Sequence, residues 1–173
     1  AIPSTASAGN VDIDIHFGQG FGFGYGPGWG GGYGPYKPHC MPGKALYSAM
    51  LNESAGVVDD LIVYYLNDNQ YRVVINAGTA EKDLAWIAAR LADWKYEVVC
   101  IPRRDLAMIA VQGPNAKAKF WQALPETRTA SEPLKAFFSA IVGDYFVAST
   151  GYTGEDGFEL TLPATQAEAV WQK

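Results

Sequence analysis

The stretch TGYTGEDGFEL, residues 150–160, predicts a glycine-rich turn that leads into a short strand. Its glycines permit a tight reversal, and Glu155-Asp156-Gly157 is favourable chemistry for a hairpin loop. The strand that follows carries one carboxylate, Glu159, between Phe158 and Leu160. A plain hairpin with an exposed acid would show the same pattern, and the physics of the turn alone favours that interpretation over a binding site.

A second segment, residues 56–65, reads as a strand rich in β-branched and aromatic residues, with two adjacent acids near its start. Side chains alternate between the faces of a strand, so Asp60, Ile62 and Tyr64 share one face. Asp59 falls on the opposite face. One acid could therefore face a cavity and polarise a nitrogen-containing ligand. The alternative is that both acids end a turn and stay hydrated.

The remaining segments predict an α+β fold with antiparallel hairpins and ferredoxin-like units. Thr79 is a suitable helix N-cap, because Glu81 and Asp83 follow in the first turn and an apolar stripe continues behind them. Further strands are expected at residues 45–51, 71–76, 97–101, 106–111, 145–150 and 158–162. Helices are expected at 115–124 and from 164 onward, with a short helix or extended piece at 133–138.

The first 42 residues differ from the rest. Glycine alternates with aromatic residues over positions 17–35, and such a density of glycine predicts a low-complexity, disordered segment. Before it, VDIDIH at residues 11–16 alternates and could form a strand with Asp12, Asp14 and His16 on one face. This strand could be a solvated edge strand or, less favoured, part of a metal site.

Composition excludes several classes of protein. The chain has 173 residues, is 49% hydrophobic, and has a formal net charge of -5 and a pI near 4.9, so a general nucleic-acid binder is not expected. Its two cysteines, Cys40 and Cys100, show no metal-site or disulfide-framework spacing. No apolar run has the length of a membrane span.

Six ordered blocks of sequence carry a family resemblance. They are GKALYS at 43–48, GVVDDLIVY at 56–64, VINA at 74–77, EKD at 81–83, VQGP at 111–114 and TGYTGEDGFE at 150–159. Together they resemble the glycine cleavage system T protein, the tetrahydrofolate-dependent aminomethyltransferase, over about residues 42–173. The resemblance implies two ferredoxin-like subdomains around a folate channel. Residues 43–105 would match the second subdomain, and residues 106–173 would match part of the first, truncated at its C-terminus.

The resemblance also implies roles for individual residues. Glu159 would accept hydrogen bonds from the 2-amino group and ring N–H of the pterin. Asp60 would be the functional carboxylate near the N5/N10 edge of the folate, with Asp59 pointing away. Further residues would line the channel, namely Tyr47, Tyr64, Tyr152 and, as a weaker candidate, Asn76. Family members tend to carry Tyr-Tyr-Ser where this chain has Phe137-Phe138-Ser139, which keeps a stacking surface and loses a hydroxyl.

The activity implied is transfer of an aminomethyl group from lipoylated H protein to tetrahydrofolate, which acts as substrate, without a metal. Methylenetetrahydrofolate and ammonia would be the products. Neither nucleic acid nor membrane is an expected partner, and the compartment would be the bacterial cytoplasm or the mitochondrial matrix. The fragment alone is expected to be weakly active or inactive. The alternatives are a non-catalytic folate-binding relative and a secreted interaction protein that acts through the Gly-aromatic segment.

Overall fold

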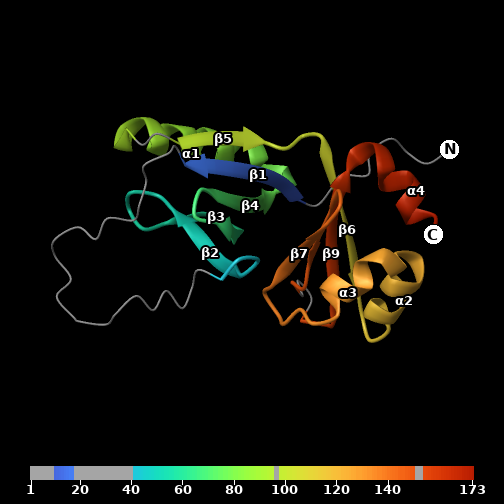
Figure 1. Cartoon of the computed structure of the whole chain (residues 1–173). Helices are drawn as coiled ribbons and strands as arrows, with labels where there is room; N and C mark the ends of the chain where they lie inside the picture. Colours follow the sequence, from blue (N-terminus) through green and yellow to red (C-terminus); the bar gives the residue numbers. More distant parts are fainter. Residues whose placement is uncertain (1–9, 18–40, 96–97, 151–153) are drawn as a thin grey trace.

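The computed structural model describes residues 10–17, 41–95, 98–150 and 154–173, which form two antiparallel sheets (Figure 1). The first sheet has the strand order β2-β3-β4-β1-β5, and the second has the order β6-β9-β8-β7. The strands of the first sheet are β1 (Asn10–Phe17), β2 (Ala45–Leu51), β3 (Val57–Asn67), β4 (Gln70–Asn76) and β5 (Val98–Pro102). Those of the second are β6 (Leu106–Gln112), β7 (Ser139–Val142), β8 (Tyr145–Ala148) and β9 (Gly157–Pro163). The α+β prediction with antiparallel hairpins is confirmed.

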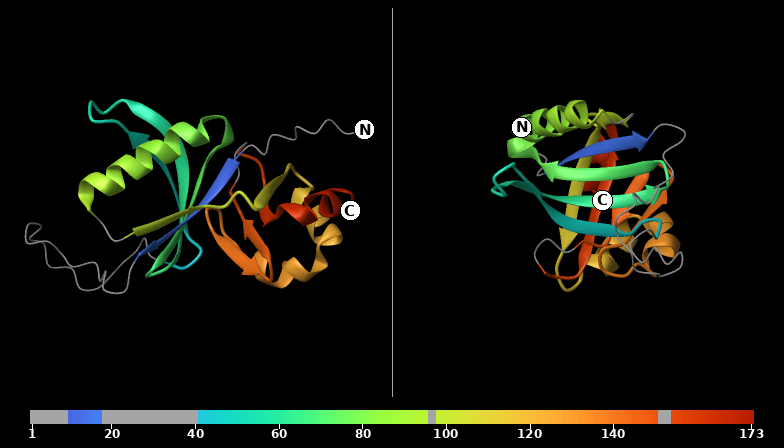
Figure 2. Two further views of the ribbon diagram at one scale, coloured as in Figure 1. Left: turned by 90° about the horizontal axis from the view of Figure 1, so that it is seen from above. Right: turned by 90° about the vertical axis from the view of Figure 1, so that its left-hand side faces the viewer.

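The helices cover the outer faces of the two sheets, so the layers run helix, sheet, sheet, helix (Figure 2). Helix α1 (Ala80–Trp94) packs on the first sheet, and α2 (Ala116–Ala123) and α4 (Ala167–Trp171) lie against the second. Shorter turns complete the set: η1 (Ala77–Thr79), η2 (Pro125–Thr127), α3 (Arg128–Ser131) and η3 (Ala164–Gln166). Residues 133–138, expected to be a short helix or an extended piece, contain no helix, and Phe138 forms an isolated antiparallel bridge with Lys44. Among the described residues, no helix combines the length and apolarity needed to cross a bilayer.

Three clusters of buried side chains hold these layers together. One lies between α1 and the first sheet and includes Ile13 and Ile75, and another lies between α2 and the second sheet and includes Phe120 and Phe158. The third joins the two sheets around Tyr64, whose ring meets Phe146 edge-on at 4.9 Å between ring centres. Edge-to-face packing of buried aromatic rings adds to the stabilisation that burial provides. The two sheets therefore share one continuous apolar contact.

Strand β1 corrects the prediction for the N-terminal segment. It lies inside the first sheet, antiparallel to both β4 and β5, and Ile13 is fully buried. Because α1 connects two parallel strands, β4 and β5, the crossover leaves a space one strand wide, and β1 fills it. The interpretation of residues 11–16 as an edge strand is wrong, and so is disorder for residues 10–17. Residues 18–40, including the Gly-aromatic run, lie outside the described residues.

The two acids of β1 are buried instead of being hydrated, and Asp14 is held in an ionic network. Asp14 accepts hydrogen bonds from Arg72 at 2.9 Å and from Arg103 at 2.6 Å. Arg72 stands directly across from Asp14 on β4, and its guanidinium lies 4.7 Å above the ring of Phe146 in the second sheet. In the part of the chain that the structure describes, no group of three or more His, Cys, Asp or Glu side chains could hold a metal ion. The metal alternative for Asp12, Asp14 and His16 therefore has no support.

Gly157, where β9 begins opposite Gln112, is a position at which only glycine fits. A Cβ there would lie 2.2 Å from the carbonyl oxygen of Val111 and 2.9 Å from Cα of Gln112, both backbone atoms. We expect Gly157→Ala to lower the free energy of unfolding by about 1–3 kcal/mol, because the strand pair must separate. Gly78→Ala is the matched control, since a Cβ at Gly78 meets nothing within 4 Å. Urea unfolding of both variants checks this, and equal stability of the two would contradict it.

Candidate functional site

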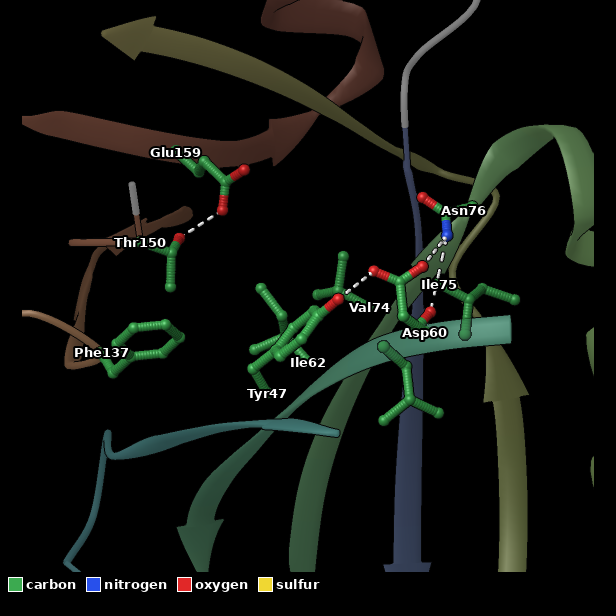
Figure 3. Close-up of a pocket in the computed structure, with 10 residues that line it drawn as sticks. Tyr47, Asp60, Ile62, Val74, Ile75, Asn76, Phe137, Thr150 and Glu159 are labelled. Carbon is green, nitrogen blue, oxygen red and sulfur yellow. Dashed lines mark hydrogen bonds between the residues drawn. The ribbon is translucent and has the colours of Figure 1, made fainter. Parts of the chain in front are cut away.

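A pocket of about 240 Å³ lies between the two sheets (Figure 3). Strands β2, β3 and β4 form one wall, and residues on or near the second sheet form the other. Its lining side chains are mainly apolar, with one carboxylate at each end. The lining residues are Tyr47, Asp60, Leu61, Ile62, Val74, Ile75, Asn76, Phe137, Thr150 and Glu159.

Asp60 marks the end of the pocket nearest the first sheet, and two neighbours fix its carboxylate. The hydroxyl of Tyr47 donates to Oδ2 at 2.7 Å, and Nδ2 of Asn76 donates to Oδ1 at 2.8 Å. The same Nδ2 also donates to Oδ1 of Asp59 at 2.9 Å. Because carboxylates only accept, the Asn76 amide must turn its nitrogen toward both acids. Asn76 therefore bridges the two adjacent carboxylates and orients Asp60.

Asp59 belongs to a different environment, as the alternation of β3 predicts. It is not part of the pocket lining and accepts hydrogen bonds from the hydroxyl of Thr79 and the N–H of Asp60. The bond from Thr79 is the main reason that the pKa of Asp59 lies far below its usual range. Burial raises the pKa of Asp83, and the neighbouring Asp59 raises it further. Thr79 stands at the N-cap position but donates to Asp59 and makes no side-chain cap bond, which corrects its predicted role.

Glu159 occupies the other end of the pocket and is only 5% exposed. Burial raises the pKa of its carboxyl, and a hydrogen bond donated by Thr150 to Oε2 opposes that rise. An aromatic wall stands near this end, because Phe137 lines the pocket with its backbone in the left-handed region at φ 60°. Its N–H donates to Ser149 O at 2.9 Å and its carbonyl accepts from Ala45 N at 2.8 Å, which holds this conformation.

Four of the six site residues predicted from the sequence line this pocket: Tyr47, Asp60, Asn76 and Glu159. The structure differs from the prediction at Tyr64, which was expected to line the channel. Tyr64 is 1% exposed and lies in the core between the sheets, not among the residues that line the pocket. Tyr152 lies outside the described residues. Thr150 was missed as a site residue. Its only sequence signal was its position at the head of the glycine-rich turn, which does not reveal that its hydroxyl meets Glu159.

The geometry suits a flat, partly apolar ligand. Phe137 and Tyr47 offer aromatic surface, and Ile62 and Val74 offer aliphatic surface. The carboxylates at the two ends accept hydrogen bonds, so a fitting ligand carries N–H donors at separated points of its edge.

Comparisons with known proteins agree with this geometry. A family model described as the GCVT N-terminal domain matches residues 37–173. The chain is 57% identical to the aminomethyltransferase of Nitrosomonas eutropha over 133 residues, which cover 77% of this chain and 37% of that protein. It is 62% identical to the aminomethyltransferase of Bordetella avium over 132 residues, which cover 76% of this chain and 36% of that protein. The crystal structure of glycine cleavage system aminomethyltransferase T from Bartonella henselae is similar with a TM-score of 0.74 and 28% identity, covering 95% of this chain and 43% of that chain.

These similarities extend over most of this chain but over a minor part of its relatives. The chain spans about a third of the length of the curated relatives it matches. The family model covers most of the described residues, including every residue that lines the pocket. The resemblance carried by the six sequence blocks is thus confirmed, and the chain belongs to the GCVT N-terminal domain family of the glycine cleavage system T protein.

Proposed function

We propose that the pocket is the pterin end of a tetrahydrofolate site and that the chain forms part of an aminomethyltransferase. The observation that carries this proposal is the pair of carboxylates, Asp60 and Glu159, at opposite ends of one apolar slot. Glu159 accepts from the 2-amino group and ring N–H of the pterin, which a single carboxylate can bind together. Asp60 lies toward the N5/N10 edge, where the transferred carbon arrives.

In the proposed reaction, the aminomethyl group leaves the lipoyl sulfur of H protein for N5 of tetrahydrofolate. Ammonia is lost, the carbon closes onto N10 as methylenetetrahydrofolate, and dihydrolipoyl protein is released. The chain's own contribution is position and charge. Asp60, held by Tyr47 and Asn76, stabilises the cationic character that develops at N5. The names of the relatives support this activity, and lipoylated H protein is the partner it requires.

The proposed subdomain assignment follows the two sheets. Residues 43–105, with β1, form the second folate-binding subdomain, and residues 106–173 form part of the first. Tyr47 and Asn76 act through Asp60, whereas Tyr64 supports the site from the core. Tyr152 keeps its proposed place in the channel lining. Since the relatives are bacterial, the bacterial cytoplasm is the proposed compartment. No metal is part of the proposal.

The test is binding and does not require turnover, because this chain spans about a third of its relatives and we expect weak or absent catalysis from it alone. We expect isothermal titration with 5-formyltetrahydrofolate, an oxidation-resistant reduced folate, to show saturable binding at one site. p-Aminobenzoylglutamate, which lacks the pterin, should bind far more weakly. Equal heats from the two compounds, or none from either, would contradict a pterin site.

A further inference from the structure

Three oxygen-bearing side chains form a buried chain that ends at Glu159. Tyr64 extends from β3 in the first sheet, Thr150 follows β8 in the second, and Glu159 stands on β9. The hydroxyl of Thr150 donates to Oε2 of Glu159, and the hydroxyl oxygens of Tyr64 and Thr150 are 3.3 Å apart. The three residues are 1%, 2% and 5% exposed, respectively, so bulk water does not compete for these bonds. This series of hydrogen bonds therefore crosses from the first sheet to the second before it reaches the pocket.

While Glu159 is ionised, the two hydroxyl groups of this hydrogen-bond series can donate in one direction only. A carboxylate only accepts, so Thr150 gives its single proton to Glu159. The Thr150 oxygen then accepts, and Tyr64 is the donor to it. Burial raises the pKa of Tyr64, which keeps its O–H protonated throughout the neutral range. Both hydroxyl protons consequently point toward Glu159.

Little else around Glu159 favours its charged form. Among the described residues, no Lys or Arg lines the pocket, and the residues directly opposite Glu159 on the neighbouring strands are Ala110 and Ala148. In the part of the chain that the structure describes, the titratable groups that face Glu159 are Tyr64 and, across the pocket, Asp60. Burial alone would favour the protonated acid, which has a donor where the pterin also has donors. The hydrogen bond from Thr150 is the interaction that opposes this outcome.

We propose that Thr150 and, through it, Tyr64 are positioning residues that hold Glu159 as an ionised acceptor at the pocket end, which restricts the pocket to ligands with hydrogen-bond donors there. The side chain of Gln112 supports this role, because its Nε2 donates to the backbone carbonyl oxygens of Thr150 at 3.5 Å and Phe158 at 3.3 Å. Within the described residues, Oε1 of Glu159 accepts no hydrogen bond and remains for the ligand. The identity of the ligand as a folate rests on the proposed function, whereas the state of Glu159 does not.

The first experiment follows Glu159 without any ligand. The full chain is labelled with ¹³C at the glutamate side-chain carboxyl, and the Glu159 signal is assigned by its absence in Glu159→Gln. In Thr150→Val, which keeps the shape and removes the hydroxyl, the Glu159 titration should move to higher pH. Thr150→Ser should restore it. Tyr64→Phe should move it in the same direction by less, because the 3.3 Å contact is the longer one.

A matched control separates this effect from a general loss of stability. Thr127 is fully buried and donates to Leu124 O at 2.7 Å, outside the pocket. Thr127→Val should therefore lower stability and leave the Glu159 titration unchanged. A Glu159 titration in Thr150→Val that coincides with wild type would overturn the proposal. If Thr150→Val does not fold, two further variants keep the proposal testable. An unchanged Glu159 titration in Tyr64→Phe overturns the role of Tyr64. A folded Thr150→Ser whose Glu159 titration is shifted overturns the role of the Thr150 hydroxyl.

The second experiment adds the ligand. At neutral pH, Thr150→Val should bind 5-formyltetrahydrofolate roughly tenfold more weakly than wild type, with Thr150→Ser close to wild type. The loss in Thr150→Val should shrink as the pH rises, because Glu159 regains its charge. If the variants shift the Glu159 titration as described above and wild type binds no folate, the proposed function fails and the positioning of Glu159 stands. If folate binds and Thr150→Val leaves both titration and affinity unchanged, the positioning proposal fails alone.

Discussion

Asp14→Asn is expected to lower the free energy of unfolding at neutral pH by about 3–5 kcal/mol, since it breaks a buried ion pair by removing one partner. Burial opposes the charge on Asp14, but the hydrogen bonds and charges of Arg72 and Arg103 outweigh it and lower the pKa of the carboxyl. The substitution leaves Arg72 buried beside an amide that can meet only part of its donors. The loss should shrink as pH falls below the ordinary Asp value of 3.8, because protonation then removes the same charge from wild type.

Asp12→Asn, two residues away on the same strand, should act in the opposite direction. Asp12 is equally buried, at 4% exposure, but burial raises its pKa to about 6, and its Oδ1 has no hydrogen-bond partner among the described residues. Between 3.8 and about 6 the folded state holds a proton that the unfolded state has lost, so stability falls as pH rises through this window. A rise of about 2 in pKa corresponds to about 3 kcal/mol at neutral pH. Asn removes the charge, and we expect a net gain of about 1–2 kcal/mol after the amide is buried.

Urea unfolding of wild type and the two variants at pH 7, pH 4 and about pH 2.5 checks both expectations, and the lowest pH is needed because the loss in Asp14→Asn should shrink only below 3.8. At pH 7 the variants should lie on opposite sides of wild type, and at pH 4 the gain from Asp12→Asn should disappear. The pair is a matched control, because both substitutions replace a buried Asp of β1 by the same residue. Losses of similar size in both variants at pH 7 would contradict the assigned network. No loss in Asp14→Asn at pH 7 would contradict the pairing of Asp14 with Arg72 and Arg103 inside the sheet.

Glu159→Gln is expected to weaken binding of 5-formyltetrahydrofolate by roughly ten- to a hundredfold, which corresponds to about 1.5–3 kcal/mol. The substitution removes a charged acceptor and introduces an N–H₂ donor at the place where the pterin presents its own donors. Asp60→Asn keeps size and shape and should spare binding more, because its proposed role lies in the transfer step. Isothermal titration of the three proteins measures the difference.

Glu155→Gln provides the control for charge at this end of the pocket. Glu155 lies four residues before Glu159 but is exposed and is not part of the lining. Its substitution should leave the affinity within about twofold of wild type, since exposed charges interact weakly through water. Equal and small effects of Glu159→Gln and Asp60→Asn would mean that neither carboxylate faces the ligand.

Local pattern was sufficient for much of this protein. The β2–β3 and β8–β9 hairpins, helix α1 and helix α2 all lie where turn chemistry and hydrophobic spacing predict them. The period of two in β3 also assigned Asp60 to the face that lines the pocket and Asp59 to the other face, because a strand's alternation is a property of its backbone. Glu159 and Asp60 became candidates for the same site only through the family resemblance, since they lie 99 positions apart in the sequence.

Tertiary structure decided what covers each face, and there the sequence was insufficient. Alternating acids in residues 11–16 are typical of a solvated edge, yet Arg72 and Arg103 pair with Asp14 inside the sheet. Tyr64 shares its face with Asp60, as predicted, but the second sheet packs over it and makes it a core residue. The hydroxyl of Thr79 donates to Asp59, 20 positions away, and the hydroxyl of Thr150 donates to Glu159, 9 positions away, so neither interaction follows from the local sequence. The sequence by itself determined the elements and the faces of their side chains, whereas only the packing of distant segments determined which faces became core, ion pair or pocket.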